Sequence, residues 1–145
     1  MKSYVACTLP SCSLLVDSEA VRAVVEQGRI IAVPNLRFPF SALLIRQDRA
    51  YPVIHLDVLL HITPPGARYI LLRNRHNQVF CLQTGCLPRI QRMDIPDKTT
   101  PVAAIAREFT QGGDRYYQLL TDGLYDLNKR DLQLLAKKVD GGTGT

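Results

Sequence analysis

Tryptophan is absent from the sequence, and the six tyrosines are dispersed along the chain. No block of basic residues is interleaved with aromatic ones. Proteins that hold single-stranded nucleic acid stack its bases on aromatic side chains along a basic groove. This composition therefore argues against nucleic acid as a partner. The formal charge of +5 nevertheless keeps a basic nucleic-acid-binding β-barrel module as an alternative hypothesis.

Long apolar runs are also missing. No run approaches the roughly 20 residues that a membrane-spanning helix needs, and the first residues lack the apolar core of a secretory signal. We therefore expect a cytoplasmic protein without membrane insertion. The apolar fraction of 46% indicates a globular chain. Its 145 residues suit one domain, or two small subdomains that share a core.

Motifs for catalysis and cofactor binding are lacking as well. The three histidines, His55, His61 and His76, form no H-x-x-x-H or H-E-x-x-H pair. No glycine-rich phosphate loop occurs, so we expect no metal and no cofactor. His55 lies among apolar residues, which is typical of a hydrogen-bonded structural histidine. A Cys/His nucleophile would need its partners to meet in space, so an enzyme remains a third hypothesis.

The four cysteines form two pairs, Cys7 with Cys12 and Cys81 with Cys86. Zinc sites often have ligands at similar short spacings. The second pair, however, lies in the apolar run V-F-C-L-Q-T-G-C-L, where a cysteine is more often a small buried apolar residue. Disulfides are not the default in a reducing cytoplasm. The interpretation that we favour is four structural thiols.

The most informative stretch runs from Val33 to Leu60. A proline-punctuated loop leads into an apolar strand at Ser41–Ile45, a polar turn at Arg46–Arg49 and a second strand at Tyr51–Leu56. An apolar turn at Asp57–Leu60 closes the stretch. Two apolar runs separated by a few polar residues predict a β-hairpin. Nothing in this hairpin is arranged for catalysis.

Similar signals predict further elements along the chain. A helical turn is expected at Ala20–Val25, capped by Ser18, and Arg29–Val33 is expected to be extended. Pro-Pro and Pro-Gly steps at Thr63–Gly66 predict a break between two halves. Three more hairpins pair Tyr4–Cys7 with Ser13–Val16, Arg68–Arg73 with Val79–Thr84, and Val102–Phe109 with Arg115–Leu120. A helical stripe covers Asp126–Val139, and residues 141–145 read as a flexible tail.

The hairpin stretch resembles a segment of the chemotaxis coupling proteins, the CheW-like family. That family carries a motif close to V-P-N-x-P-x-x-V-x-G-x-I-N-L-R-G-x-x-L-P-V-I-D-L. Three positions depart from it: Ala42 replaces a glycine, Arg46-Gln47-Asp48 replaces Leu-Arg-Gly, and His55 replaces an aspartate. The family arginine is thus either replaced by Gln47 or shifted to Arg46. The matching residues are Val33, Pro34, Asn35, Leu43, Leu44, Pro52, Val53, Ile54 and Leu56.

The resemblance implies an all-β fold of two small five-stranded SH3-like barrel subdomains with a C-terminal helix. It implies a single domain at residues 1–140, with a subdomain boundary near residues 62–67. A protein of this kind would be a noncatalytic adaptor that couples chemoreceptors to a chemotaxis-type histidine kinase, in chemotaxis or in a pilus-linked chemosensory system. Its partners would be the receptor cytoplasmic tip and the regulatory domain of the CheA-type kinase.

The resemblance also implies a partner-binding site on the hairpin stretch. Core packing is the alternative role for each apolar residue of this set, whereas the charge of Arg46 favours an exposed contact. The candidate residues are Val33, Leu43, Leu44, Ile45, Arg46 and Gln47.

Overall fold

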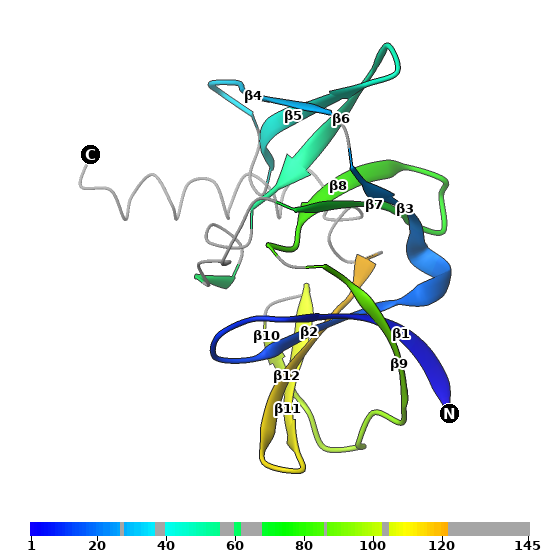
Figure 1. Cartoon of the computed structure of the whole chain (residues 1–145). Helices are drawn as coiled ribbons and strands as arrows, with labels where there is room; N and C mark the ends of the chain where they lie inside the picture. Colours follow the sequence, from blue (N-terminus) through cyan, green and yellow to red (C-terminus); the bar gives the residue numbers. More distant parts are fainter. Residues whose placement is uncertain are drawn as a thin grey trace, which may run out of the picture.

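In the part of the chain that the structure describes, twelve β-strands and one 3₁₀ turn form a two-lobed molecule (Figure 1). The computed structural model describes residues 1–26, 28–36, 40–55, 60–61, 68–85, 87–102 and 105–121. Its elements are β1 (Lys2–Thr8), β2 (Ser13–Asp17), the 3₁₀ turn η1 (Ser18–Ala20), β3 (Val21–Val25), β4 (Arg29–Ala32), β5 (Phe40–Arg46), β6 (Arg49–Ile54), β7 (Tyr69–Arg73), β8 (Val79–Gln83), β9 (Arg89–Met93), β10 (Thr100–Val102), β11 (Ala106–Gln111) and β12 (Asp114–Leu119).

Each lobe is built on one sheet. The lower lobe in Figure 1 has the strand order β10-β11-β12-β2-β1-β9, and the upper lobe has the order β3-β7-β8-β6-β5-β4. The expected all-β fold of two small subdomains is confirmed. Each sheet contains six strands, one more than the resemblance implies.

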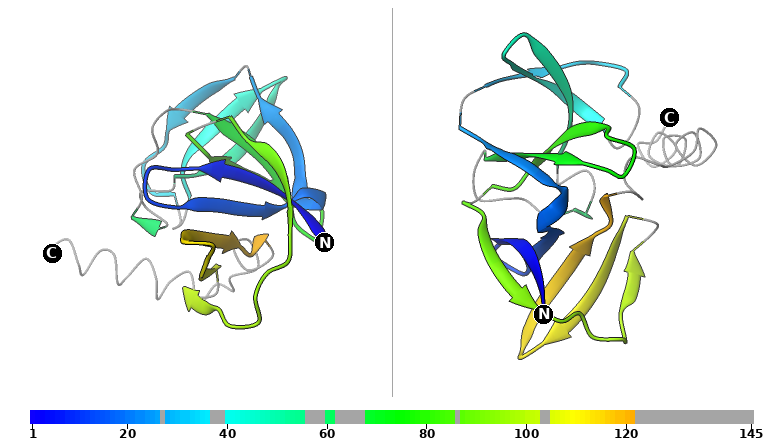
Figure 2. Two further views of the ribbon diagram at one scale, coloured as in Figure 1. Left: turned by 60° about the horizontal axis from the view of Figure 1, so that its bottom comes forward. Right: turned by 90° about the vertical axis from the view of Figure 1, so that its right-hand side faces the viewer.

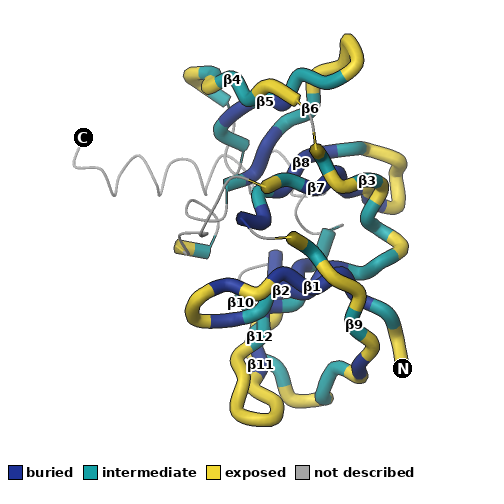
Figure 3. The backbone as a smooth tube through the Cα atoms, in the orientation of Figure 1, coloured by how far each residue is buried: buried dark blue, intermediate teal, exposed yellow. Residues whose placement is uncertain are grey.

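Three hydrophobic clusters hold the molecule together. One lies within the lower lobe around Tyr4, Leu15 and Phe109, and another lies within the upper lobe around Leu44 and Leu71. The largest cluster contains residues of both sheets. Alternate residues of β2, β7 and β8 contribute to it, because they lie on the face of their sheet opposite to the one that packs within its own lobe. It includes Leu14, Val16, Ile70, Leu72, Phe80 and Leu82. The strands where the lobes meet are accordingly the most buried in Figure 3.

The two sheets have the same topology. In the lower lobe, the hairpin β1–β2 is flanked by β9 on one side, and β2 runs parallel to the last strand of the meander β10-β11-β12 on the other. In the upper lobe, the hairpin β7–β8 is flanked by β3, and β8 runs parallel to the last strand of the meander β4-β5-β6. Strands β1–β6 and β7–β12 are therefore two repeats of one six-strand pattern.

The repeats exchange their hairpins. The hairpin β1–β2 of the first repeat completes the sheet made by β9–β12, and the hairpin β7–β8 of the second repeat completes the sheet made by β3–β6. Both views of Figure 2 show β1 and β2 lying with the green-to-orange strands of the second half. Neither sheet is complete without strands from both halves of the chain.

The predicted hairpins are confirmed. Antiparallel pairing joins β1 to β2, β5 to β6, β7 to β8 and β11 to β12. Gly112 and Gly113 form the turn of the last hairpin with φ of 62° and 83°. These left-handed values favour glycine, which has no Cβ to clash. The segment expected to be extended at Arg29–Val33 contains β4.

The predicted helical turn at Ala20–Val25 is wrong. Only Ser18–Ala20 is helical, and Val21–Val25 is strand β3, which pairs with β7. Its three valines favour a strand because branching at Cβ suits a pleated surface. The predicted N-cap residue is also wrong by one position. Asp17, not Ser18, is the N-cap, and its Oδ1 accepts a hydrogen bond of 3.0 Å from the Glu19 backbone N–H.

Several predicted features lie outside the described residues. They are the turn at Asp57–Leu60 except for Leu60, the break at Thr63–Gly66, the boundary at residues 62–67, Cys86, the helix at Asp126–Val139 and the tail at residues 141–145. Within the described part of the chain, no helix has the length and apolarity needed to cross a membrane.

Candidate docking surfaces

The β5–β6 hairpin places the predicted site residues at its tip. Gln47 and Asp48 form the two-residue turn, with φ of 50° and 62°. Two successive left-handed residues are typical of the type I′ turn that matches the twist of a hairpin. Arg46 and Arg49 are direct cross-strand partners on either side of the turn. The altered family motif therefore still forms a tight hairpin turn, with a pair of arginines at its base.

Strand β5 divides the candidate residues between two faces. Leu44 is only 1% exposed and packs with Ala42 and Val53 in the upper core, so it takes the core-packing role. Leu43 and Ile45 are half-buried on the opposite face, where Leu43 pairs with Ile31 of β4. Val33 is half-buried beyond the end of β4. Gln47 is exposed and Arg46 is half-buried, so these two are the polar candidates that solvent reaches.

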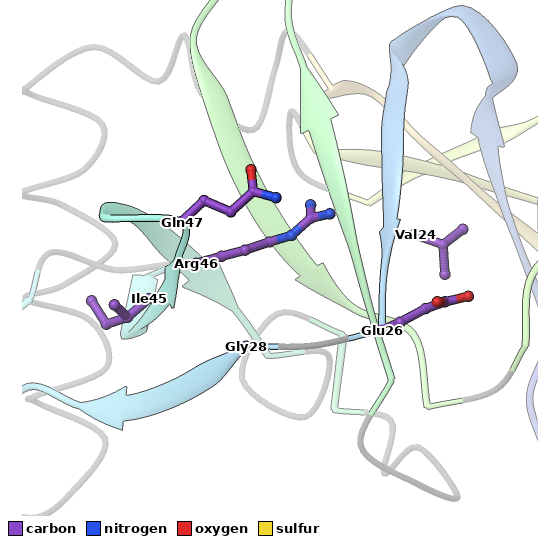
Figure 4. Close-up of a pocket in the computed structure, with 6 residues that line it drawn as sticks. All are labelled: Val24, Glu26, Gly28, Ile45, Arg46 and Gln47. Atoms are coloured by element: carbon purple, nitrogen blue, oxygen red, sulfur yellow. The ribbon is translucent and has the colours of Figure 1, made fainter.

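Three of the candidates line one pocket of about 330 Å³. Ile45, Arg46 and Gln47 form one wall, and the segment from β3 to β4 forms the other with Val24, Glu26 and Gly28. In Figure 4 the side chains of Arg46 and Gln47 extend in the same direction, toward β3. The polar side chains of Arg46 and Gln47 thus reach across the pocket, whereas the side chains of Val24 and Ile45 point away from Arg46.

One wall of the pocket contains a glycine that lies close to the core. Gly28 lies against Leu44, so that a Cβ on residue 28 would stand 2.6 Å from Leu44 Cδ1 and 3.5 Å from the Ile45 carbonyl oxygen. Leu44 is buried and has little freedom to move away. A larger residue at position 28 would therefore force the Leu44 side chain to shift.

A second surface, on β9, was missed from the sequence. Leu87, just before the strand, is 68% exposed, and Ile90, near the start of the strand, is 65% exposed. β9 pairs with β1 on one side and is an edge of its sheet on the other. Exposed apolar side chains on an edge strand are a feature of surfaces that dock other proteins. The signal in the sequence was the placement of Ile90 between Arg89 and Gln91.

Ser41 and His55 form a polar contact inside the upper lobe. Ser41 Oγ lies 2.5 Å from His55 Nδ1, and the His55 ring meets the edge of Tyr69 with 6.4 Å between ring centroids. A serine nucleophile needs a base that a third group orients. No carboxylate takes that position among the described residues. The hydrogen bond instead joins β5, at its bulge, to the end of β6, which confirms the structural role expected for His55.

The three described cysteines are core residues. Cys7 and Cys81 are fully buried and Cys12 is 7% exposed, as expected for structural thiols. Burial raises the pKa of Cys81 to about 12 and also raises the pKa of Cys12. Nucleophilic cysteines require a lowered pKa. Cys81 is therefore a poor candidate for the Cys/His site of the enzyme hypothesis.

Comparison with known proteins identifies the fold. No protein-family model matches the sequence, and no curated protein matches it. Among solved structures, the scaffolding protein TtCheW from Thermoanaerobacter tengcongensis superimposes with a TM-score of 0.69 at 19% sequence identity. The match covers 88% of this chain and 94% of the TtCheW chain. The low identity agrees with the departures in the hairpin motif, and the chain has a diverged CheW-like fold.

Proposed function

We propose that this protein is a noncatalytic adaptor, which couples chemoreceptors to a chemotaxis-type histidine kinase by binding both. The observation that carries the proposal is the CheW-like fold bearing two surfaces that suit protein docking. One surface is the pocket beside Arg46 and Gln47, and the other is the exposed apolar edge at Leu87 and Ile90. One lobe carries each surface, so two partners can bind at once.

The chemistry of the two surfaces supports binding over catalysis. The edge of β9 offers apolar side chains beside backbone groups that no other described strand pairs, which favours a partner that covers the strand. The pocket offers the guanidinium donors of Arg46 and the amide donors of Gln47. Such a surface anchors a partner side chain and fixes its orientation. The pilus-linked setting is part of the proposal as one of the chemosensory systems in which an adaptor of this kind operates.

The proposal is tested by measuring complex formation with two purified partners, a receptor cytoplasmic tip and a kinase regulatory domain. The variants are Ile90→Asp for the β9 edge and Arg46→Glu for the pocket. Thr110→Asp, an exposed change on β11, is the control for added negative charge. We expect the wild-type protein and the control to bind both partners, and each of the other variants to lose one.

Circular dichroism of all variants separates loss of binding from loss of folding. Wild-type protein that binds neither partner would remove the adaptor function. Binding that survives both Ile90→Asp and Arg46→Glu would leave the adaptor but move its interfaces to other surfaces.

A further inference from the structure

The tip of the β5–β6 hairpin holds two like charges against each other. Arg46 and Arg49 are direct cross-strand partners, so their side chains leave the same face of the sheet. Like charges at this spacing destabilise a hairpin. Among the described residues, neither arginine side chain forms an ion pair or a hydrogen bond. The hairpin thus keeps a repulsive pair that nothing within the described chain neutralises.

The acids nearby do not engage this pair. Asp48 lies in the turn between the arginines and Glu26 lines the same pocket, yet neither is within ion-pair distance of them. In Figure 4 the carboxylate of Glu26 points away from the guanidinium of Arg46. A third arginine, Arg29, is exposed on the neighbouring strand opposite Ile45. The tip therefore carries more positive than negative charge.

The turn holds the two arginines at a fixed spacing. A two-residue type I′ turn leaves the flanking pair little freedom, since its ends are hydrogen-bonded in register. Here the turn uses Gln47 and Asp48 in left-handed conformations, where glycine would be less strained. Both the strain and the repulsion cost stability. Features of this kind are kept where a site needs its side chains prearranged.

We propose that Arg46 and Arg49 form a clamp for carboxylates on an acidic segment of a partner protein. This inference rests on the proposed function, because it takes the occupant of the pocket to be a protein. Two guanidinium groups can each bind a carboxylate through paired charge-assisted hydrogen bonds. Asp48 and Glu26 disfavour a densely charged polyanion such as a nucleic-acid strand at this site.

The test uses the whole protein and follows the side-chain Nε–H resonances of its arginines by NMR. The probe is a capped hexaglutamate peptide, and single-stranded hexathymidylate is the competing polyanion. The variants Arg46→Gln and Arg49→Gln remove one charge each. Arg107→Gln is the matched control, because Arg107 is an exposed arginine on β11 of the other lobe. We expect hexaglutamate to shift Arg46 and Arg49 saturably, and each clamp variant to weaken binding by about threefold or more while the control leaves it unchanged.

Two results in the peptide titration would overturn the clamp. One is a small shift spread evenly over all exposed arginines, with Arg107→Gln as harmful as the clamp variants. The other is tighter binding of hexathymidylate than of hexaglutamate at Arg46 and Arg49, which would make the tip a nucleic-acid contact.

The same variants separate this inference from the adaptor function. If wild-type protein binds the receptor tip and the kinase domain, and Arg46→Gln and Arg49→Gln bind both equally well, the adaptor stands and the clamp is wrong. If hexaglutamate binds at the clamp but wild-type protein binds neither partner, the clamp stands and the adaptor function is wrong.

Discussion

Gly28 and Leu44 lie so close that the smallest side chain at position 28 would overlap the leucine, with 2.6 Å between the new Cβ and Leu44 Cδ1. We expect Gly28→Ala to lower the free energy of unfolding by about 1–3 kcal/mol, the usual cost of forcing extra volume into a packed site. Urea denaturation provides the measurement. The double variant Gly28→Ala, Leu44→Ala checks the cause, because removing the leucine methyls should leave the added alanine with almost no further cost. An equal cost in both backgrounds would show that backbone change, not this contact, is responsible.

Substitutions in the turn at Gln47 and Asp48 should increase the stability of the protein. Both residues have left-handed backbone conformations that Asn-Gly adopts with less strain. We expect the double variant Gln47→Asn, Asp48→Gly to raise the free energy of unfolding by about 0.5–1.5 kcal/mol. Thermal denaturation followed by circular dichroism measures the change. Gln111→Asn serves as control, since Gln111 lies at the end of β11 without a left-handed φ. A variant less stable than wild type would indicate that the contacts of Gln47 or Asp48 stabilise the protein by more than their backbone strain destabilises it.

Reversing one charge of the arginine pair should stabilise the fold. In Arg49→Glu the cross-strand pair at the hairpin base becomes attractive, and we expect a gain of about 0.2–1 kcal/mol. Salt at about 1 M should shrink the gain, because it screens exposed charges. Arg107→Glu changes the net charge by the same amount without a cross-strand arginine, since its neighbours are Pro101 and Gln118. Equal gains in the two variants would attribute the effect to net charge alone.

Cys81 should make stability fall at alkaline pH. Burial raises the pKa of this thiol to about 12 in the folded protein, so between about pH 9 and pH 12 the thiol ionises only in the unfolded chain. The contribution of the neutral Cys81 thiol to the free energy of unfolding is therefore fully present below about pH 9. It is lost as the pH rises toward 12, at up to about 1.4 kcal/mol per pH unit. Urea unfolding at pH 8 to 10 should show a steeper decline for wild type than for Cys81→Ala. Parallel declines would mean that the thiol does not titrate differently in the two states.

Local features of the fold followed from the sequence because short-range chemistry determines them. The hairpins at Ser13 and Gly112 were marked by apolar runs around turn residues, and the β5–β6 hairpin by its resemblance to a known motif. The error at Val21–Val25 arose because a cap signal at Ser18 was extended through residues whose branching at Cβ favours a strand. Alternation along β5 predicts two faces, but it does not say that Leu44 and not Leu43 faces the core.

Long-range features did not follow from the sequence. Pairing of β1 with β9 and of β2 with β12 joins residues from opposite ends of the chain, and no local signal specifies it. The repeated six-strand pattern is likewise visible in the pairing alone. The exposure of Leu87 and Ile90 depends on β9 being an edge, which only the completed sheet reveals. That Arg46 and Arg49 form a cross-strand pair could be known only from the exact register of β5 against β6.

The exchange of hairpins between the two halves has a consequence for how the chain folds as it is synthesised. β2 pairs with β12, about 100 residues further along, and pairing between segments so far apart in the chain slows folding. The first hairpin leaves the ribosome long before its sheet partners β9 and β12 exist. Until β12 arrives, β1 and β2 expose the apolar residues that later fill two cores. The growing chain therefore has to keep its earliest strands from aggregating until its last strand arrives.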